Sequence, residues 1–215
     1  AMFLFMSATV YGAHTGHEIY NSMEKTFLWI NENTSPLGDG DSVESDYYVI
    51  AMSRANRTFD YSKYKKITRS KTPQTMGDAH RIIISNAACD GRFNETFVAD
   101  CTYNNNLADV SDLSGAILAL CSGEYEVKGK NTTIDDLVVR LLLNQSSNGS
   151  FGNDIITTSE SIIALSFFEG NIYEVKGDYK TEVYYYDVNN AILRGVNYLQ
   201  GAKDQECGYG NIKST

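Results

Sequence analysis

The side chains that could bind a metal ion are few and widely spaced in this sequence. There are 4 cysteines and 3 histidines, and no two cysteines form a Cys-x-x-Cys pair. Zinc ligands in proteins lie closer together along the chain, so we expect no zinc centre. The stretch from Asp39 to Ser42 begins like a calcium-binding loop, but Val43 and Glu44 then take the places of an oxygen ligand and a glycine. We therefore expect a turn here and no bound metal.

Nucleotide and acyl-transfer chemistry also lack their usual sequence signatures. The chain contains neither a Gly-Lys-Ser/Thr phosphate loop nor a Gly-x-Ser-x-Gly nucleophile turn. One short run, between residues 63 and 71, is rich in lysine and arginine. A run of this length favours a solvated helix face over an anion-binding site.

Charge and composition argue against two classes of protein. Asp+Glu number 27 against 18 for Lys+Arg, which gives a formal net charge of -9. Nucleic acids and anionic membranes attract basic surfaces, so we expect neither as a partner. No apolar run is long enough to span a membrane. The hydrophobic fraction of 42% indicates a globular chain, and with only 2 prolines long segments are free to be helical.

Two kinds of helix are predicted to alternate along the chain. Residues 132–145 and 187–200 carry apolar side chains at helical spacing with polar residues opposite, which indicates outer helices with one buried face. Residues 114–121 and 159–168 are apolar on nearly every side, as expected of inner helices. The residues from Thr157 to Glu160 match a capping box that would begin the second inner helix.

An internal repeat indicates that one helical unit occurs several times. The pentapeptide Tyr-Glu-Val-Lys-Gly stands at Tyr125–Gly129 and again at Tyr173–Gly177, each time after an apolar run. A spacing of about fifty residues is typical of stacked units. Gly-, Asn- and Asp-rich turns should join the helices, and any strand should be minor and lie near residues 2–12. The expected outer and inner helix pairs are 18–32 with 45–55, 61–70 with 76–89, 93–103 with 110–121, and 132–145 with 157–168, followed by an outer helix at 187–200.

At this point the chain resembles the α/α-toroid superfamily. The residues from Gln145 to Gly152 are similar to its Gln-x-x-Asp-Gly-x-Phe-Gly turn, and those from Thr158 to Leu165 are similar to its inner helix. The superfamily includes terpenoid cyclases, protein prenyltransferase β-subunits, complement thioester domains and cobalamin carriers of the transcobalamin/intrinsic-factor type; non-catalytic bacterial surface toroids look most similar. The resemblance implies an all-α fold, an incomplete α/α toroid of stacked antiparallel helix pairs.

The catalytic motifs of the superfamily are incomplete in this sequence. The Asp-x-Asp-Asp motif of the cyclases has its best match at Asp135 and Asp136, which lack the first acid and would complement the dipole of an outer helix. No Asp, Cys and His set matches the zinc site of the prenyltransferases. Cys207 lacks the glycine and glutamine of a thioester motif. The chain is therefore expected to carry no catalytic residue and no cofactor.

In toroids the inner helices converge on a mouth that holds the ligand. The resemblance therefore implies that residues at the N-terminal ends of the inner helices bind it, although several could equally serve as N-caps. These candidate ligand-binding residues are Asp46, Tyr47, Tyr48, His80, Asp112, Ser114, Thr158, Glu160 and Asn211.

The expected function is a non-catalytic, secreted or surface-displayed binding module for a small molecule, such as a cobalamin-like compound, or for a polymer. Two alternatives remain: a fragment of a cyclase- or transferase-like enzyme whose catalytic residues lie outside this chain, and a structural spacer of a surface protein. Sequons for N-glycosylation at Asn94, Asn144 and Asn148, among others, agree with secretion without proving it. If the protein is secreted, we expect at least one disulfide, with Cys89, Cys101 and Cys121 as the candidates.

The two ends of the chain carry separate expectations. Residues 1–17 would form an N-terminal arm or the remnant of a secretion signal, and residues 18–215 the toroid domain. The residues from Gly210 to Thr215 resemble the start of another inner helix, so the fifth helix pair would be truncated. The apolar face of residues 187–200 would then be uncovered, which would favour self-association or a partner domain at this edge.

Overall fold

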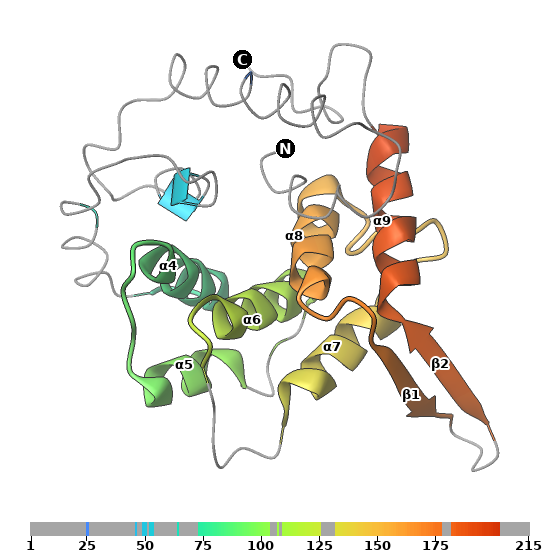
Figure 1. Ribbon diagram of the computed structural model, residues 1–215, viewed down its shortest axis with the longest axis horizontal. Coiled ribbons are helices and arrows are strands. Elements are labelled where there is room, and N and C mark those ends of the chain that lie inside the picture. Colours follow the sequence, from blue (N-terminus) through green and yellow to red (C-terminus); the bar gives the residue numbers. More distant parts are fainter. Residues whose placement is uncertain are drawn as a thin grey trace.

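The computed structural model describes residues 25, 46, 49–50, 52–53, 64, 73–103, 107, 109–125, 132–177 and 182–202 (Figure 1). Between residues 73 and 202 these form six helices and one β-hairpin. The elements are α4 (Met76–Ala88), α5 (Glu95–Thr102), α6 (Val110–Ser122), α7 (Ile134–Leu143), α8 (Ile155–Ser166), β1 (Ile172–Lys176), β2 (Val183–Asp187) and α9 (Val188–Ala202). The chain is thus mostly helical, as predicted, with one small sheet.

The helices begin where a side chain caps them. Thr75 and Thr133 each form a capping box with an aspartate three residues later. The predicted N-cap of α8, Thr157, was wrong by three residues: the N-cap is Asp154, whose carboxylate accepts the backbone N–H of Thr157 at 2.8 Å. Thr157 therefore lies within the first turn, because the aspartate three residues earlier already satisfies its N–H.

Helices α4, α6 and α8 form an inner row in which α6 lies between the other two (Figure 1). The segments that follow α4 and α6 meet at one end, where the Arg92 guanidinium donates to the Gly123 carbonyl at 2.8 Å. Near the other end, Ser111 of α6 donates to Glu160 of α8 at 3.3 Å. These bonds connect the segments that follow α4 and α6 with each other, and α6 with α8.

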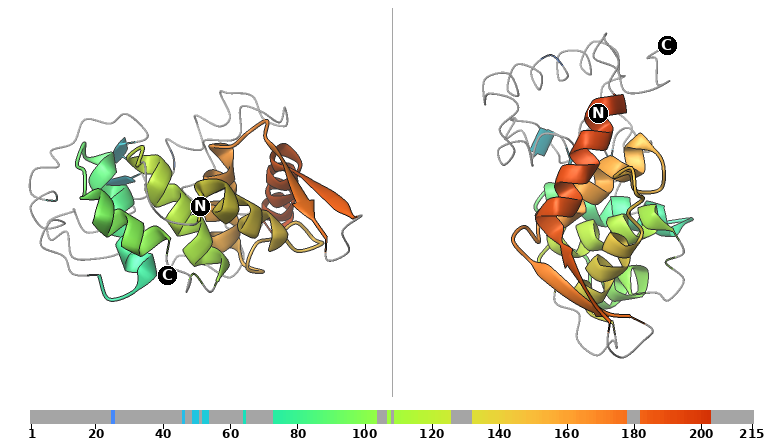
Figure 2. Two further views of the ribbon diagram at one scale, coloured as in Figure 1. Left: turned by 90° about the horizontal axis from the view of Figure 1, so that it is seen from below. Right: turned by 90° about the vertical axis from the view of Figure 1, so that its right-hand side faces the viewer.

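Helices α5, α7 and α9 pack against this row. α5 and α7 contact α6, and α9 contacts α8 (Figure 2). The expected pairing of residues 132–145 with residues 157–168 was therefore wrong, because α7 makes its main helix contact with α6. The core between the layers is aliphatic, and its fully buried side chains include Ile117, Leu137, Leu141, Phe151, Ile162 and Leu165.

The apolar face of α9 is covered in the structure. Val188, Ile192 and Leu199 are fully buried, and α9 packs along α8. The expectation that this face lies uncovered was wrong, since α8 and the turn before it pack against α9. The apolar face of α9 therefore gives no reason to expect self-association at this edge, which stays an untested prediction.

A β-hairpin occupies the segment where only turns were expected. β1 and β2 pair antiparallel, with Tyr173 opposite Tyr186 and Glu174 opposite Tyr185. The second copy of the repeated pentapeptide supplies most of β1, because its alternating aromatic and β-branched residues favour a strand. The Tyr173 and Tyr186 side chains pack against the core, whereas Tyr185 is 69% exposed.

Several expectations fall on residues that lie outside the described ones. They concern the arm at residues 1–17, the strand near residues 2–12, the helix at 18–32, and the end of the chain from residue 203. Within the predicted helix at 45–55, residues 46, 49–50 and 52–53 are helical, and so is Tyr64 in the next one. Among the helices that the structure describes, none combines the length and the apolar character needed to cross a membrane.

Candidate functional site

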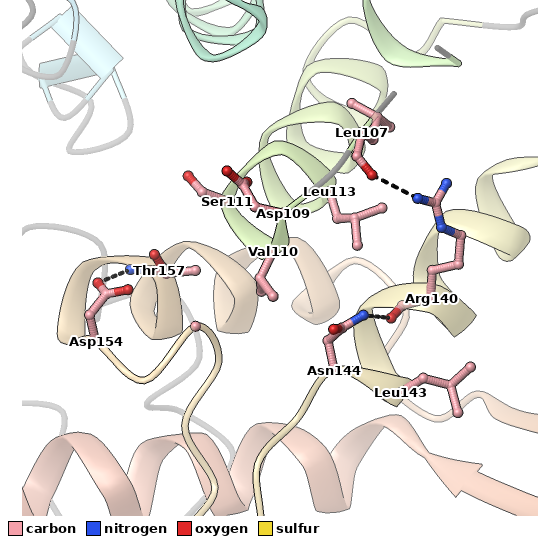
Figure 3. A pocket seen from close by; sticks show the side chains of 11 residues that line it. Leu107, Asp109, Val110, Ser111, Leu113, Arg140, Leu143, Asn144, Asp154 and Thr157 are labelled. Atoms are coloured by element: carbon pink, nitrogen blue, oxygen red, sulfur yellow. Dashed lines mark hydrogen bonds between the residues drawn. The ribbon is translucent and has the colours of Figure 1, made fainter. Parts of the chain in front are cut away.

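A pocket of about 430 Å³ lies where α6 and α8 begin, beside the end of α7 (Figure 3). Among the residues that the structure describes, none of those that the sequence predicted to bind a ligand lines it. Its lining comes from three helices and the segments that precede or follow them. The lining residues are Leu107, Asp109, Val110, Ser111, Leu113, Arg140, Leu143, Asn144, Gly152, Asp154 and Thr157.

Two carboxylates of the pocket are the N-caps of the inner helices. Asp109 accepts the backbone N–H of Asp112 at 2.7 Å, and Asp154 accepts that of Thr157 at 2.8 Å. Each bond uses the Oδ1 atom of the aspartate. The capping bonds hold both carboxylates in place, because an N-cap side chain satisfies a backbone donor that the helix itself leaves unpaired.

The opposite wall of the pocket comes from α7. The Arg140 guanidinium donates to the Leu107 carbonyl at 2.8 Å, and the Asn144 amide donates to the Arg140 carbonyl at 2.8 Å. In Figure 3 Arg140 lies on the side of the pocket away from Asp109 and Asp154. The positive and negative charges of the lining are therefore separated across the cavity.

Apolar side chains complete the lining. Val110 and Leu113 extend from α6 toward α7 in Figure 3, and Leu143 of α7 is 49% exposed. The pocket consequently combines an aliphatic surface with fixed polar groups, which is the usual make-up of a small-molecule site.

The turn that carried the family resemblance has a structural role. Gln145 donates through its amide to the carbonyls of Gly149 and Ala191, at 3.0 and 2.8 Å. The Thr158 hydroxyl accepts from the Phe151 backbone N–H at 2.9 Å. These bonds fasten the turn to α9 and to α8, and they place Gly152 at the edge of the pocket.

The predicted site residues on α6 and α8 lie beside the pocket but do not line it. The Ser114 hydroxyl is buried and bonds to the Ser161 hydroxyl at 2.7 Å, which joins the two helices. Thr158 is buried in the turn described above, and Glu160 accepts from Ser111. Asp112 is half-buried, and burial together with the charge of Asp109 raises its pKa.

His80 is buried between α4, α5 and α6 and does not face the pocket. Its Nε2 atom lies 2.9 Å from the Cys101 carbonyl, so this nitrogen carries the proton and donates. A Cβ atom on Gly115 would stand 2.7 Å from the Nδ1 atom of His80, so this glycine allows the close packing. Burial lowers the pKa of His80, which favours a neutral ring.

Asp46 joins the N-terminal part of the chain to α4. It is buried, accepts a hydrogen bond from the Tyr64 hydroxyl and forms an ion pair with Arg81 at 2.7 Å. Three binding candidates, Tyr47, Tyr48 and Asn211, lie outside the described residues.

The two acids that the sequence analysis compared with a catalytic motif take part in hydrogen bonds that stabilise the fold. Asp136 completes the capping box of α7, and the Thr133 N–H bond lowers its pKa. Asp135 accepts from the Tyr173 hydroxyl at 2.8 Å. The expected disulfide does not join the three cysteines of the described part of the chain, where Cys101 and Cys121 are thiols, and it stays a prediction for a secreted protein. In the same part no three His, Cys, Asp or Glu side chains gather into a metal site.

Sequence reasoning missed the residues that line the pocket, namely Asp109, Asp154 and the α7 pair Arg140 and Asn144. The two aspartates could have been found as N-caps, since Asp109 directly precedes the predicted helix at 110–121 and Asp154 directly precedes Ile155 and Ile156. The α7 residues gave no such signal, because only the packing of α7 against α6 brings them to the pocket. Comparison of the chain with protein families, with curated proteins and with solved structures finds no match.

Proposed function

We propose that this chain is a non-catalytic binding module, built as an incomplete α/α toroid, whose ligand occupies the pocket at the N-terminal ends of α6 and α8. In this proposal the protein is secreted or displayed on a cell surface. The row of α4, α6 and α8, with α5 and α7 packed against α6 and α9 packed against α8, supports the proposed toroid arrangement.

The pocket is the observation that carries the proposal. It lies at the end of the inner helices where toroids hold their ligands, and its volume of about 430 Å³ falls within the range of roughly 300–1,000 Å³ that is usual for ligand sites. A volume near the lower limit favours a ligand smaller than a cobalamin. The mixture of aliphatic and charged side chains favours a ligand with both kinds of group.

The arrangement of the pocket gives no support to catalysis. In each aspartate one carboxylate oxygen accepts a backbone N–H at a helix N-terminus, and Arg140 donates to a backbone carbonyl. No pair of groups in the lining is placed as a nucleophile with its base, which nucleophilic catalysis requires. Binding is thus the activity that these residues support best.

The proposal is tested by a fragment screen on the full chain with ligand-observed NMR. Ser111 is exposed on α6 at the pocket, so Ser111→Trp should fill the cavity and abolish the binding of fragments that enter it. Gln200→Trp on the exposed face of α9 is the matched control and should leave binding unchanged.

The proposal fails if no fragment of the screen binds, or if every fragment that binds does so equally well to both tryptophan variants. Circular dichroism of both variants must show the helical spectrum of the parent chain, so that loss of binding is not loss of folding.

A further inference from the structure

The charges that line the pocket sum to a negative value. Its ionisable residues are Asp109, Asp154 and Arg140. The guanidinium of Arg140 is bonded to the Leu107 carbonyl and lies across the cavity from the two carboxylates (Figure 3). A ligand group that enters beside the carboxylates therefore meets an excess of negative charge.

The surroundings strengthen this field. Asp112 stands in the first turn of α6, between the pocket residues Ser111 and Leu113 in the sequence. The whole chain has a formal net charge of -9. Electrostatic attraction would draw cations toward such a cavity and repel anions, because the summed field acts beyond contact distance.

The two carboxylates are prepared to accept hydrogen bonds from a ligand. Each gives its Oδ1 atom to a capping bond, and the described residues donate no hydrogen bond to the Oδ2 atoms of Asp109 and Asp154. A carboxylate that is already fixed by the protein loses little freedom on binding, which favours affinity.

The aliphatic part of the lining favours a hydrocarbon chain in the rest of the ligand. Val110, Leu113 and Leu143 offer hydrocarbon surface between the carboxylates and α7. An alkyl chain of a few carbons would cover this surface and gain free energy by leaving water. A bare metal cation or a fully hydroxylated sugar would leave it exposed.

From this cavity we propose that the ligand group is an aliphatic cation: an ammonium or guanidinium group on an alkyl chain, with the cation at Asp109 and Asp154 and the chain along Val110, Leu113 and Leu143. The inference rests on the proposed function and names the ligand class of the same pocket. A free polyamine and the lysine or arginine side chain of a peptide share this chemistry.

The test uses three compounds with the same five-carbon chain: cadaverine, pentanediol and glutarate. Their binding to the full ¹⁵N-labelled chain is followed by NMR shifts of the backbone amides around Asp109 and Asp154. Cadaverine should bind, and raising the salt concentration should weaken it severalfold because salt screens the charges. Pentanediol and glutarate should bind at least about tenfold more weakly, since they lack the charge-assisted hydrogen bonds.

The matched variants are Asp154→Asn and Asp109→Asn. Asparagine caps a helix as well as aspartate does, so these changes remove the charge and keep the capping acceptor. Each should weaken cadaverine about tenfold. Asp90→Asn is the control, because Asp90 is exposed beyond the end of α4 and its φ of 56° suits asparagine. It should leave the affinity unchanged.

Spermidine and a Gly-Lys-Gly peptide then distinguish the two sources of the cation, and tighter binding of either one assigns it. The inference is overturned if pentanediol or glutarate binds as well as cadaverine and Ser111→Trp blocks it; the pocket then still binds ligands, and the proposed function stands. The inference is also overturned if cadaverine binds equally to the parent chain and to both asparagine variants, or if cadaverine does not bind at all. The proposed function is tested separately, by the fragment screen.

Discussion

Some of the buried polar side chains that the structure describes join helices to one another. Ser114 and Ser161 exchange a hydrogen bond between α6 and α8, and small side chains at this contact let the helices approach. His80 similarly links α4 to the carbonyl of Cys101. The two serine hydroxyls and the Nε2 atom of His80 thus have partners within the fold, whereas the buried Nδ1 atom of His80 has none among the described residues.

His80 should make the protein less stable in mild acid. Burial holds its pKa below the ordinary value of 6.5, so the unfolded chain takes up a proton at a higher pH than the folded one. Stability should be unaffected above that value, fall as the pH drops through it, and level off below the pKa of the folded state. The slope is at most about 1.4 kcal/mol per pH unit.

The measurement is urea unfolding at several pH values between neutrality and pH 5 for the parent chain and His80→Gln. Glutamine can still donate to the Cys101 carbonyl but does not titrate. The difference between the two free energies should therefore change with pH in the stated direction. A difference that is constant over this range would contradict the prediction.

The hydroxyl of Tyr173 should stabilise the hairpin. It donates to Asp135 at 2.8 Å, whereas the hydroxyl of the exposed Tyr185 in the neighbouring strand makes no hydrogen bond to a described residue. Tyr173→Phe should cost about 1 kcal/mol in urea unfolding, the usual worth of one hydrogen bond. Tyr185→Phe is the control and should change the free energy of unfolding by less than half as much.

Ionisation of the same hydroxyl should lower the stability of the protein at alkaline pH. Burial, supported by the bond to Asp135, raises the pKa of Tyr173 from 10.0 to about 12. The unfolded chain thus loses this proton first, and stability should decline as the pH rises through this window. Ultraviolet titration should show one late-ionising tyrosine fewer in Tyr173→Phe than in the parent chain, where burial raises the pKa of Tyr103 as well.

At the scale of elements, the turn between α7 and α8 is fitted closely to α9. Gly149 has a φ of +92°, and a Cβ atom there would stand 2.3 Å from the Arg194 carbonyl oxygen. Arg194 in return donates to the Ser146 carbonyl at 2.7 Å. The turn and α9 therefore position each other through backbone contacts, which require glycine at this point.

Gly149→Ala should destabilise the protein by about 2 kcal/mol or more, because the backbone strain alone costs roughly 1–3 kcal/mol. Thermal or urea unfolding measures the loss. Gly201→Ala in α9 is the control: no atom lies within 4 Å of the added methyl group, so the change should be neutral or stabilise by up to about 1 kcal/mol. Equal effects of the two substitutions would refute this account.

At the scale of the whole molecule, Phe151 anchors the described helices to a common core. Its ring is fully buried in the cluster to which α5, α6, α7, α8 and α9 all contribute. Phe151→Ala should cost about 3–5 kcal/mol, as large-to-small changes in a core do. The 44% exposed Phe167 is the control, and Phe167→Ala should cost less than about 1 kcal/mol.

Chemical denaturation followed by both circular dichroism and tyrosine fluorescence measures these losses. Coincident transitions would show that the helices unfold as one unit. A loss for Phe151→Ala no larger than that for Phe167→Ala would mean that the cluster does not hold the layers together.

The sequence by itself determined the helices and their order. Apolar spacing and capping residues are local signals, so the helices from α4 to α9 were predicted with ends in error by a few residues at most. The all-round apolar character of α6 agrees with its place in the fold, because α6 packs against α4, α5, α7 and α8 and buries its surface among them.

The tertiary structure alone decided which residues form the site. Asp109 and Asp154 look in the sequence like any other N-caps, and Arg140 like any exposed residue of an outer helix. They share a pocket because α7 packs against α6, a contact between segments that no local pattern records. His80, in contrast, was expected at the mouth and is buried, since the missing side chain of Gly115 lets α6 close over it. A pocket is the space that packed helices leave between them, so its lining depends on pairings that residues distant in the chain determine together.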